Sequence, residues 1–394
     1  MNQTPVANRL HIGIFGRRNV GKSSFINALT NQELAIVSEV AGTTTDPVYK
    51  TIEILPEPGP CVIIDTAGLD DEGDLGELRK KKAVAVLDKT DLALVIIDSI
   101  ELITEFDRKL IEMIKEKDIP IVIVINKIDL LSTHSFDLKI DFPVYPVSSV
   151  TKEGIDYLRS QLNQHAPSKI EDMVILRGLI KPHDEVILVI PIDSAMPKGR
   201  LILPEVQTLR SVLDENAHAI VCKEHELSLV LEKSKPNLVV TDSQVYHIVK
   251  DIVPDHIRLT SFSMLYARYK GDFKIFAQGA QSVDNLRKND KILIVEACTH
   301  HPQPQDIGRF KIPTRLEELV GGHLEFEHMS GSGFPDDLSP YQLIIMCGSC
   351  MINRTQVMAR IRKSQAVGIP VTNYGILFAK LSGILDRTMW LATA

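Results

Sequence analysis

The sequence predicts an α/β protein of three domains with mainly parallel sheets. The chain has 394 residues, of which 44% are hydrophobic and 24% charged, a composition typical of globular proteins. This length exceeds what one hydrophobic core usually supports, so two or three domains are expected. Short runs rich in valine and isoleucine alternate with amphipathic stretches, which is the pattern of parallel strands joined by helices.

The first domain is expected at residues 1–168. Amphipathic stretches predict helices that begin at Lys22 and that cover residues 105–117, and the segment HAPSK at 165–169 is typical of a linker. The strand-like runs of this domain lie at 10–15, 61–65, 92–98, 119–125 and 145–149.

The second domain is expected at residues 169–266 and the third at 267–394. Both follow the same alternation of strand and helix, although no internal repeat is obvious in the sequence. Their strand-like runs lie at 185–192, 217–222, 237–242, 291–297 and 341–346, and their helical patterns at 204–214, 243–252 and 353–365.

The charge of the chain bears on its partners and its location. With 51 acidic and 44 basic residues the net charge is −7, which disfavours a broad surface for nucleic acid or anionic membrane. The first ten residues lack the apolar segment of a signal peptide, and the run IPIVIVI at 119–125 is far too short to span a bilayer. We therefore expect a cytoplasmic protein that binds neither nucleic acid nor membrane.

The segment GRRNVGKS at residues 16–23 follows a predicted strand and opens a predicted helix, which is the context of a phosphate-binding P-loop. In such a loop backbone N–H groups surround the phosphates, a lysine adds a positive charge and a hydroxyl binds magnesium. We expect Lys22 to be catalytic and Ser23 to bind Mg²⁺. The predicted nucleotide-binding residues of this segment are Gly16, Asn19, Val20, Gly21, Lys22, Ser23 and Ser24.

Two later motifs predict that the nucleotide is GTP. Asp65 of DTAG ends a predicted strand and is expected to hold Mg²⁺ through water, while Gly68 turns its N–H toward the γ-phosphate as a catalytic group. Asp129 of NKID can accept hydrogen bonds from N1 and the exocyclic amine of guanine, a donor pair that adenine lacks. The first domain is thus expected to be a Ras-like GTP-binding domain. Its remaining predicted base-site residues are Asn126, Lys127, Ser148 and Ser149.

The segment GTTTD at residues 42–46 lies where a switch loop is expected, and Thr44 is the predicted Mg²⁺ ligand and catalytic residue there. In this order, the motifs resemble the TrmE-Era-like branch of translation-factor GTPases over roughly the first 165 residues. That branch has a hydrophobic residue, here Leu69, in place of a water-orienting glutamine. Its members with an asparagine at the place of Asn19 often bind K⁺, so the resemblance implies slow, potassium-stimulated hydrolysis. Asn19 also fits a turn residue that tolerates unusual backbone angles.

Three of the five cysteines form a second group of candidate ligands. Cys298 and Cys347 each follow a predicted strand, so both are expected at carboxyl ends of strands, where α/β sheets bind ligands. Cys350 has the CxxC spacing from Cys347 that lets two thiolates reach one metal. Spacing alone leaves zinc, an iron-sulfur cluster and a redox pair open. Candidates for a fourth ligand are His300, His301 and Asp306, and the cysteines expected in the core are Cys61 and Cys222.

Four segments accompany the GTPase motifs, namely CTH at 298–300, GGHLEFEHMSGSGFPDDL at 321–338, CGSC at 347–350 and TNYGI at 372–376. Together they resemble the HydF family, the GTPases of FeFe-hydrogenase maturation, over the full length of the chain. The resemblance implies a G domain, a central dimerisation domain that forms a homodimer, and a C-terminal domain with a 4Fe-4S cluster. It makes Cys298, Cys347 and Cys350 the cluster ligands and His300 part of the family's CxH motif.

The same resemblance implies a scaffold that carries a di-iron precursor of the hydrogenase active site to the apo-hydrogenase. Its partners would be the apo FeFe-hydrogenase and the radical-SAM maturases. One departure is Met346, which stands where members often have histidine, so the fourth cluster ligand stays open. The alternative is a ribosome- or tRNA-associated GTPase of the same branch with a zinc-stabilised C-terminal domain. Low basic charge and the lack of a KH-like GXXG in a basic region count against it.

Overall fold

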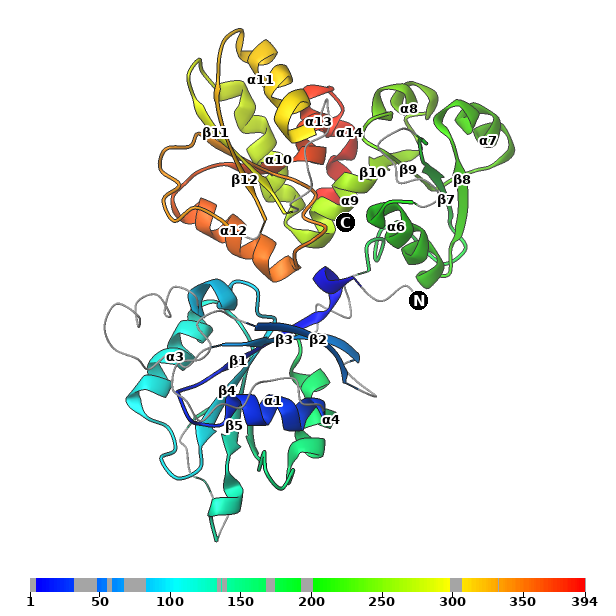
Figure 1. Ribbon diagram of the computed structural model, residues 1–394. Coiled ribbons are helices and arrows are strands. Elements are labelled where there is room, and N and C mark those ends of the chain that lie inside the picture. Colours follow the sequence, from blue (N-terminus) through cyan, green and yellow to red (C-terminus); the bar gives the residue numbers. More distant parts are fainter. Residues whose placement is uncertain are drawn as a thin grey trace. The chain divides into compact units, whose positions relative to one another are not determined.

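The computed structural model divides into two compact units, Met1–Ile170 and Glu171–Ala394 (Figure 1). Among the residues described, none of the helices combines the length and the apolar character that crossing a bilayer requires. The boundaries of the three domains expected from the sequence stay predictions. The structure describes residues 5–31, 48–54, 59–66, 83–132, 136, 140–167, 174–192, 201–297, 307–331 and 333–393.

A six-stranded sheet forms the centre of the first unit. Neighbouring strands are parallel, except that β2 runs antiparallel to β3. The carboxyl ends of the parallel strands therefore lie at one edge of the sheet, and the P-loop, DTAG and NKID motifs all begin there. The order across the sheet is β2 (Val48–Ile54), β3 (Gly59–Asp65), β1 (Leu10–Phe15), β4 (Leu92–Asp98), β5 (Ile121–Asn126) and β6 (Val144–Pro146).

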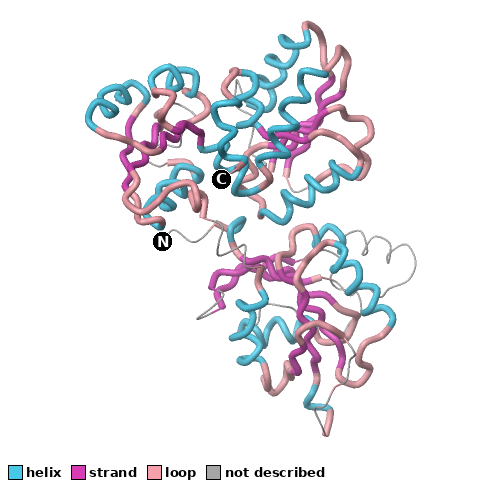
Figure 2. Tube along the Cα trace, turned by 180° about the vertical axis from the view of Figure 1, so that it is seen from behind, coloured by secondary structure: helices cyan, strands magenta, loops and turns pink. Residues whose placement is uncertain are grey.

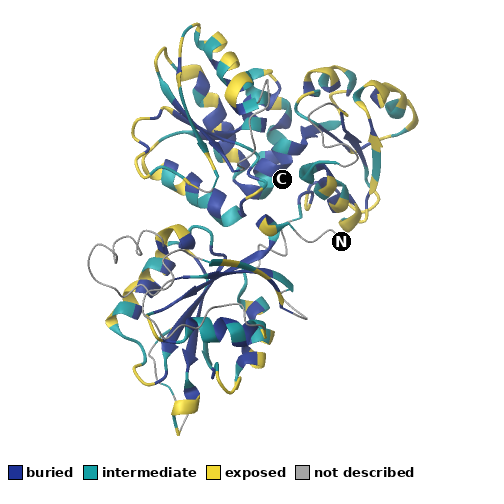
Figure 3. Cartoon of the chain, viewed as in Figure 1, coloured by how far each residue is buried: buried dark blue, intermediate teal, exposed yellow. Residues whose placement is uncertain are grey.

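Helices cover both faces of this sheet (Figure 2). One hydrophobic cluster joins α1 (Lys22–Thr30) and α4 (Ile155–His165) to Ile14 of β1. A second cluster joins α3 (Glu105–Glu116) to the opposite face, where the next residue of β1, Phe15, points. Since β1, β4 and β5 are buried on both faces, they form continuous apolar runs in the sequence, and Figure 3 shows these strands in dark blue.

The second unit contains two four-stranded sheets, and all their strands pair in parallel. In each sheet the first strand in the chain lies between the second and the third, and the fourth is at the edge. The two sheets thus have the same topology. Across the first sheet the strands are β8 (His218–Cys222), β7 (Glu185–Val189), β9 (Leu238–Thr241) and β10 (Arg258–Ser261). Across the second sheet they are β12 (Glu325–Ser330), β11 (Lys291–Glu296), β13 (Leu343–Met346) and β14 (Val371–Asn373).

The two sheets share one hydrophobic core. A single buried cluster contains Leu188 of β7, Leu265 of α9 and Val295 of β11. The helices of this unit are α6 (Leu203–Asp214), α7 (Leu227–Lys233), α8 (Tyr246–Ile252), α9 (Phe262–Lys270), α10 (Phe273–Gln281), α11 (Ile312–Val320), α12 (Arg354–Ala366), α13 (Tyr374–Leu381) and α14 (Leu385–Thr388). Among the described residues of both units, short 3-10 turns cover Val6–Asn8, Ile128–Leu130, Glu224–Glu226, Ser282–Asn285 and Met389–Ala392, and a π-helical turn covers Ile307–Lys311.

The fold class expected from the sequence is confirmed, with an N-terminal P-loop domain and further α/β sheets of parallel strands. Cys61 of β3 and Cys222 of β8 are buried core residues, also as expected. Burial raises the pKa of Cys61 to about 12 and that of Cys222 to about 11, so both thiols stay protonated at neutral pH.

Candidate nucleotide and metal sites

The P-loop connects β1 to α1 and requires glycine at two positions. Gly16 has a φ of 144°, and a Cβ there would lie 2.4 Å from the carbonyl oxygen of Ile96. Gly21 has a φ of 89°, and a Cβ there would lie 2.5 Å from Nδ2 of Asn126. Only glycine satisfies both the left-handed backbone and the close approach. Asn19, with a φ of 61°, is exposed at the turn of the loop.

Lys22 lies over the P-loop backbone. Its side chain is buried, and Nζ donates hydrogen bonds to the carbonyl oxygens of Gly16 at 2.9 Å and of Arg17 at 2.7 Å. The ammonium group is therefore already held above the loop, and bound phosphate oxygens would accept the same hydrogen bonds. Ser23 and Ser24 are partly buried in the first turn of α1, next to the loop.

Asp65 ends β3 opposite Ile14 of β1, the strand that leads into the P-loop. Burial raises the pKa of the Asp65 carboxyl, and the positive charges of Lys22 and Lys50 offset part of this effect. A carboxylate in this environment gains stability from a nearby cation, which fits the predicted Mg²⁺ role. The hydroxyl of Thr66 donates to the carbonyl oxygen of Ile14 at 2.6 Å and so fixes the start of the DTAG loop.

Asn126 joins the P-loop to the loop after β6. Its Nδ2 donates to the carbonyl oxygen of Val20 at 2.9 Å. Its Oδ1 accepts hydrogen bonds from Ser149, from the backbone N–H at 3.1 Å and from the hydroxyl at 2.8 Å. Asn126 is almost fully buried, so its described contacts hold two loops of the nucleotide site together.

Asp129 is exposed, and its carboxylate is held on one side by Ser148. The Ser148 hydroxyl donates to Oδ1 of Asp129 and accepts hydrogen bonds from the N–H groups of Val150 at 3.2 Å and Thr151 at 3.0 Å. This contact orients the carboxylate and leaves Oδ2 for a ligand. Lys127, with a φ of 67°, places Nζ 2.7 Å from Oδ2 of Asp98. The structure thus brings the predicted base-site residues of the NKID and SSV loops to one edge of the sheet.

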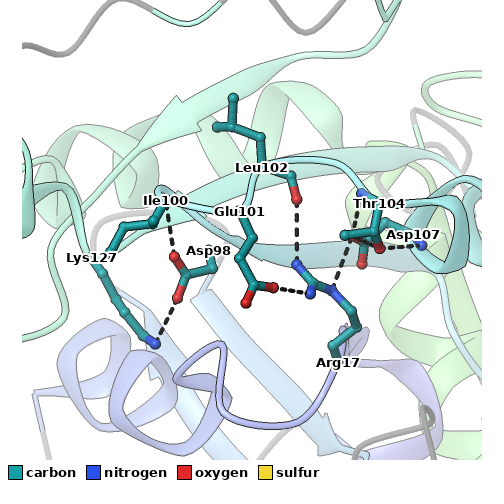
Figure 4. Close-up of polar contacts among 8 residues, drawn as sticks. All are labelled: Arg17, Asp98, Ile100, Glu101, Leu102, Thr104, Asp107 and Lys127. Carbon is teal, nitrogen blue, oxygen red and sulfur yellow. Dashed lines mark hydrogen bonds and ion pairs between the residues drawn. The ribbon is translucent and has the colours of Figure 1, made fainter.

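An ionic cluster beside the P-loop was missed by sequence reasoning (Figure 4). The Arg17 guanidinium contacts the carboxylate of Glu101 and donates to the carbonyl oxygen of Leu102 at 3.3 Å. Its Nε lies 3.2 Å from Oδ2 of Asp107, a fully buried carboxylate that also caps the N-terminus of α3. Arg17 thereby connects the P-loop to the start of α3. No motif signals this contact, because Arg17 occupies a variable position of the P-loop pattern.

We expect the substitution Arg17→Met to lower the stability of the first unit by ~2–4 kcal/mol and GTP affinity by roughly tenfold, because it leaves the buried Asp107 carboxylate without its cation. Denaturant unfolding and nucleotide titration measure the two effects. Arg159→Met is the matched control, since Arg159 donates to the carbonyl oxygen of Leu29 at 2.7 Å, at the other end of α1. Equal GTP affinity in the two variants would contradict a role of Arg17 in positioning the loop.

Cys347 and Cys350 lie at the carboxyl edge of the second sheet of the second unit. Cys347 directly follows β13, and its N–H donates to the carbonyl oxygen of Val295 in β11 at 2.9 Å. Its sulfur accepts hydrogen bonds from the N–H groups of Ala297 at 3.1 Å and Ser349 at 3.4 Å. The order of strands in the sheet reverses between β11 and β13, which is where open α/β sheets bind ligands.

The environment of the two thiols favours metal binding over the free thiolate. Burial raises the pKa of Cys347, and the N–H groups of Ala297 and Ser349 act in the opposite direction. Burial also raises the pKa of Cys350. A thiophilic metal that replaces the protons would relieve the cost of charging these buried sulfurs. The donors are soft sulfur atoms with N–H groups directed at them, which fits an iron-sulfur cluster.

Several predicted site residues lie outside the described part of the chain, namely Thr44, Gly68, Leu69, Cys298, His300, His301 and Asp306. Within the described part, no group of three or more His, Cys, Asp and Glu side chains is close enough to hold a metal ion. Met346, which stands where members of the HydF family often have histidine, is fully buried in β13 and belongs to the shared core. The metal-ligand set therefore stays a prediction.

The fold and the nucleotide site define the class of protein: the chain is a P-loop GTPase whose G domain is followed by a unit of two parallel sheets. Three protein-family models match it. They describe a 50S ribosome-binding GTPase at residues 11–127, a hydrogen maturase F dimerization domain at 175–271 and a hydrogen maturase F tetramerization domain at 274–391. The chain belongs to the hydrogen maturase F family.

Individual relatives share the GTPase character. GTPase Der of Mycoplasmopsis pulmonis is 45% identical over 124 residues, which cover 30% of this chain and 28% of that protein. The tRNA modification GTPase MnmE of Moorella thermoacetica is 37% identical over 167 residues, which cover 39% of this chain and 34% of that protein. The chain spans about a third of the length of these curated relatives. Their similarity does not favour the alternative of a ribosome- or tRNA-associated role.

Among solved structures, Era of Aquifex aeolicus bound to GDP and AlF4⁻ is 20% identical with a TM-score of 0.36, and the match covers 61% of this chain and 97% of that one. The G domain of the FeoB iron transporter of T. maritima is 22% identical with a TM-score of 0.30, over 40% and 98% of the two chains.

Proposed function

We propose that this GTPase is a scaffold in FeFe-hydrogenase maturation, which holds a 4Fe-4S cluster and delivers a di-iron precursor of the active site to the apo-hydrogenase. The observation that carries the proposal is the pair Cys347 and Cys350, at the carboxyl edge of a parallel sheet within the residues that match a hydrogen maturase F domain. Together with Cys298, these residues would hold the cluster. When bound, the cluster supplies an iron atom with a replaceable ligand, on which an exogenous fragment can dock.

Anaerobic purification and reconstitution with iron and sulfide tests this function. We expect iron and sulfide in the ratio of a 4Fe-4S cluster, and an electron paramagnetic resonance signal on reduction. Stoichiometric zinc without a reducible cluster would overturn the proposal and favour a zinc-stabilised domain instead.

In the first unit we propose that GTP hydrolysis acts as a switch on partner binding. Lys22 would exchange its carbonyl partners for phosphate oxygens, while Ser23 and Asp65 hold Mg²⁺ and Thr44 senses the γ-phosphate. The proposed partners are the apo-hydrogenase and the radical-SAM maturases, which the chain would meet in the cytoplasm. GTP and GDP forms with identical affinity for these partners would rule out the switch.

We further propose that K⁺ at Asn19 stimulates hydrolysis. The exposed position of Asn19 at the turn of the P-loop supports this role, because its amide oxygen is accessible to a cation beside the phosphates. Turnover is expected to be at least severalfold faster in KCl than in NaCl. Asn19→Gly keeps the left-handed backbone and removes the amide, so the variant should lose most of the difference between the salts. Equal turnover of the natural chain in both salts would refute K⁺ stimulation.

A homodimer through the central domain is the proposed assembly. The dimerization-domain match at residues 175–271 supports oligomerisation, and β8 forms an edge of the first sheet of this unit. Val221 on this strand is 49% exposed, and an edge strand offers unpaired N–H and carbonyl groups to a second copy. Sedimentation of the full chain as a monomer at micromolar concentration would exclude this assembly.

A further inference from the structure

A buried arginine lies beside the cysteine site with part of its hydrogen-bonding capacity unused. Arg360 of α12 is 3% exposed. Its Nη2 donates to the carbonyl oxygens of Gly331 at 3.2 Å and Gly333 at 3.0 Å, in the loop that follows β12. Within the described chain, Nε and Nη1 of Arg360 have no hydrogen-bond partner. Two nitrogen atoms whose N–H groups are unpaired on a buried cation are costly, so a ligand that accepts from them would be stabilised.

The surroundings of Arg360 include Cys347. The guanidinium lies over the ring of Phe334, 5.6 Å from its centroid, and Phe334 and Cys347 both pack against the same hydrophobic cluster. Gly331, which accepts from Arg360, donates its own N–H to the carbonyl oxygen of Glu296 at the carboxyl end of β11 at 2.8 Å. Ala297, the residue after Glu296, donates its N–H to the Cys347 sulfur at 3.1 Å, so a short series of hydrogen-bonded backbone groups connects Arg360 to Cys347.

Lys270 occupies the corresponding place beside Cys350. It is the last residue of α9 and is 3% exposed. Its Nζ donates to the carbonyl oxygen of Ile352 at 3.2 Å, two residues beyond Cys350. This hydrogen bond holds the ammonium group of Lys270 at the loop that carries Cys350. Each thiol of the CxxC pair therefore has its own buried cation, although the two cations come from different helices.

One carboxylate opposes this positive charge. Glu296 is 6% exposed, and its negative charge acts on Cys347. One of its carboxylate oxygens accepts a hydrogen bond from the Tyr374 hydroxyl at 3.0 Å. Arg309 lies 3.8 Å from its other oxygen, so its negative charge is partly compensated. The described surroundings of the cysteine pair are thus positive.

We propose that Arg360 and Lys270 form a cationic wall of the cysteine site, which stabilises an anionic metal–sulfur group and, through the free N–H groups of Arg360, hydrogen-bonds its sulfur atoms. This inference rests on the proposed function. A 4Fe-4S cluster with three thiolate ligands is negatively charged, and the electron that it accepts from an added reductant such as dithionite adds one negative charge without a proton. Buried cations stabilise the reduced form more than the oxidised form, so the wall raises the reduction potential.

The test is a redox titration of the reconstituted full chain, followed by electron paramagnetic resonance. At the potential where half of the natural chain's cluster is reduced, Arg360→Met should show a ratio of reduced to oxidised cluster roughly tenfold lower, equivalent to a shift of ~59 mV for one electron. Arg360→Lys keeps the charge and should shift less. Lys270→Met should shift in the same direction as Arg360→Met.

Arg387→Met provides the matched control. Arg387 of α14 also donates to backbone carbonyls, those of Lys250 and Val253, and its Nε also lacks a partner in the described chain. Because those carbonyls belong to the segment before β10, this variant should keep the natural potential.

The outcomes separate the inference from the proposed function. A natural chain without a reducible cluster would defeat the proposed function itself. A natural chain with a cluster, and an Arg360→Met variant with the same potential, would overturn only the cationic wall. Circular dichroism shows whether each variant folds. If Arg360→Met does not fold, the redox titrations of Arg360→Lys and Lys270→Met test the inference instead. Unchanged reduction potentials in both variants would overturn it.

Discussion

The substitution Asp129→Asn is expected to lower the affinity for GTP by ~10²–10⁴-fold, because both hydrogen bonds from guanine to the carboxylate are disturbed. Ser148 holds one oxygen of Asp129, so the carboxylate is already oriented for the base. An asparagine offers one acceptor and one donor in its place. Xanthine carries a carbonyl where guanine has its exocyclic amine, so the variant should bind XTP better than the natural chain does. Isothermal titration with both nucleotides measures the change.

Asp156→Asn is a suitable control for this prediction. Asp156 has a side chain that is 92% exposed on α4, where it pairs with Arg159, so its substitution removes the same charge away from the P-loop. The control should bind GTP as the natural chain does. If Asp129→Asn also kept its affinity for GTP, the proposed mode of guanine recognition would be wrong.

Single substitutions of Cys347 or Cys350 by alanine are expected to remove at least nine-tenths of the reducible cluster. Each removes one of three proposed thiolate ligands, and the remaining two cannot hold the cluster stably. GTP hydrolysis should be unchanged, because the nucleotide site belongs to the other compact unit. Iron and sulfide analysis and electron paramagnetic resonance of the reconstituted variants measure the loss. Cys298→Ala should have the same effect.

Cys222→Ala is the control for this series, because Cys222 is a buried thiol of β8 in the same unit and is not a proposed ligand. It should lose some stability through the cavity that it creates, and still assemble the cluster. A full cluster in Cys347→Ala would show that the ligand assignment is wrong.

The strands that can be predicted from the sequence are those whose burial produces a simple pattern of residue types. β1, β4 and β5 are covered on both faces, and burial on both faces selects an unbroken apolar run. β2 and β12 lie at sheet edges and mix charged with apolar residues, so neither forms such a run. β14 has only three residues, too few for a periodic signal. The common topology of the two sheets of the second unit is likewise a property of pairing, which local sequence does not specify.

The site shows the same division between local and distant contacts. The P-loop, NKID and CxxC residues are close in sequence, because each motif binds its ligand with neighbouring backbone and side-chain groups. Arg17 instead meets Asp107 across 90 positions, and Arg360 meets the loop after β12. A charged residue in a helical pattern is typical of an exposed face, and only the packing of α12 shows that Arg360 is buried.

The helix α9 follows β10 of the first sheet of the second unit and packs against α12 and α13, the helices before and after β14 of the second sheet. Its N-terminus is capped by Ser261 at the end of β10, and its last residue, Lys270, donates a hydrogen bond to Ile352 in the loop after Cys350. Nine helical residues extend about 13 Å and do not compress readily. A force applied to the first sheet, for example when a second subunit docks there, would therefore be transmitted along this helix to the cysteine loop. The assembly state and the electronic state of the proposed cluster would then be mechanically linked.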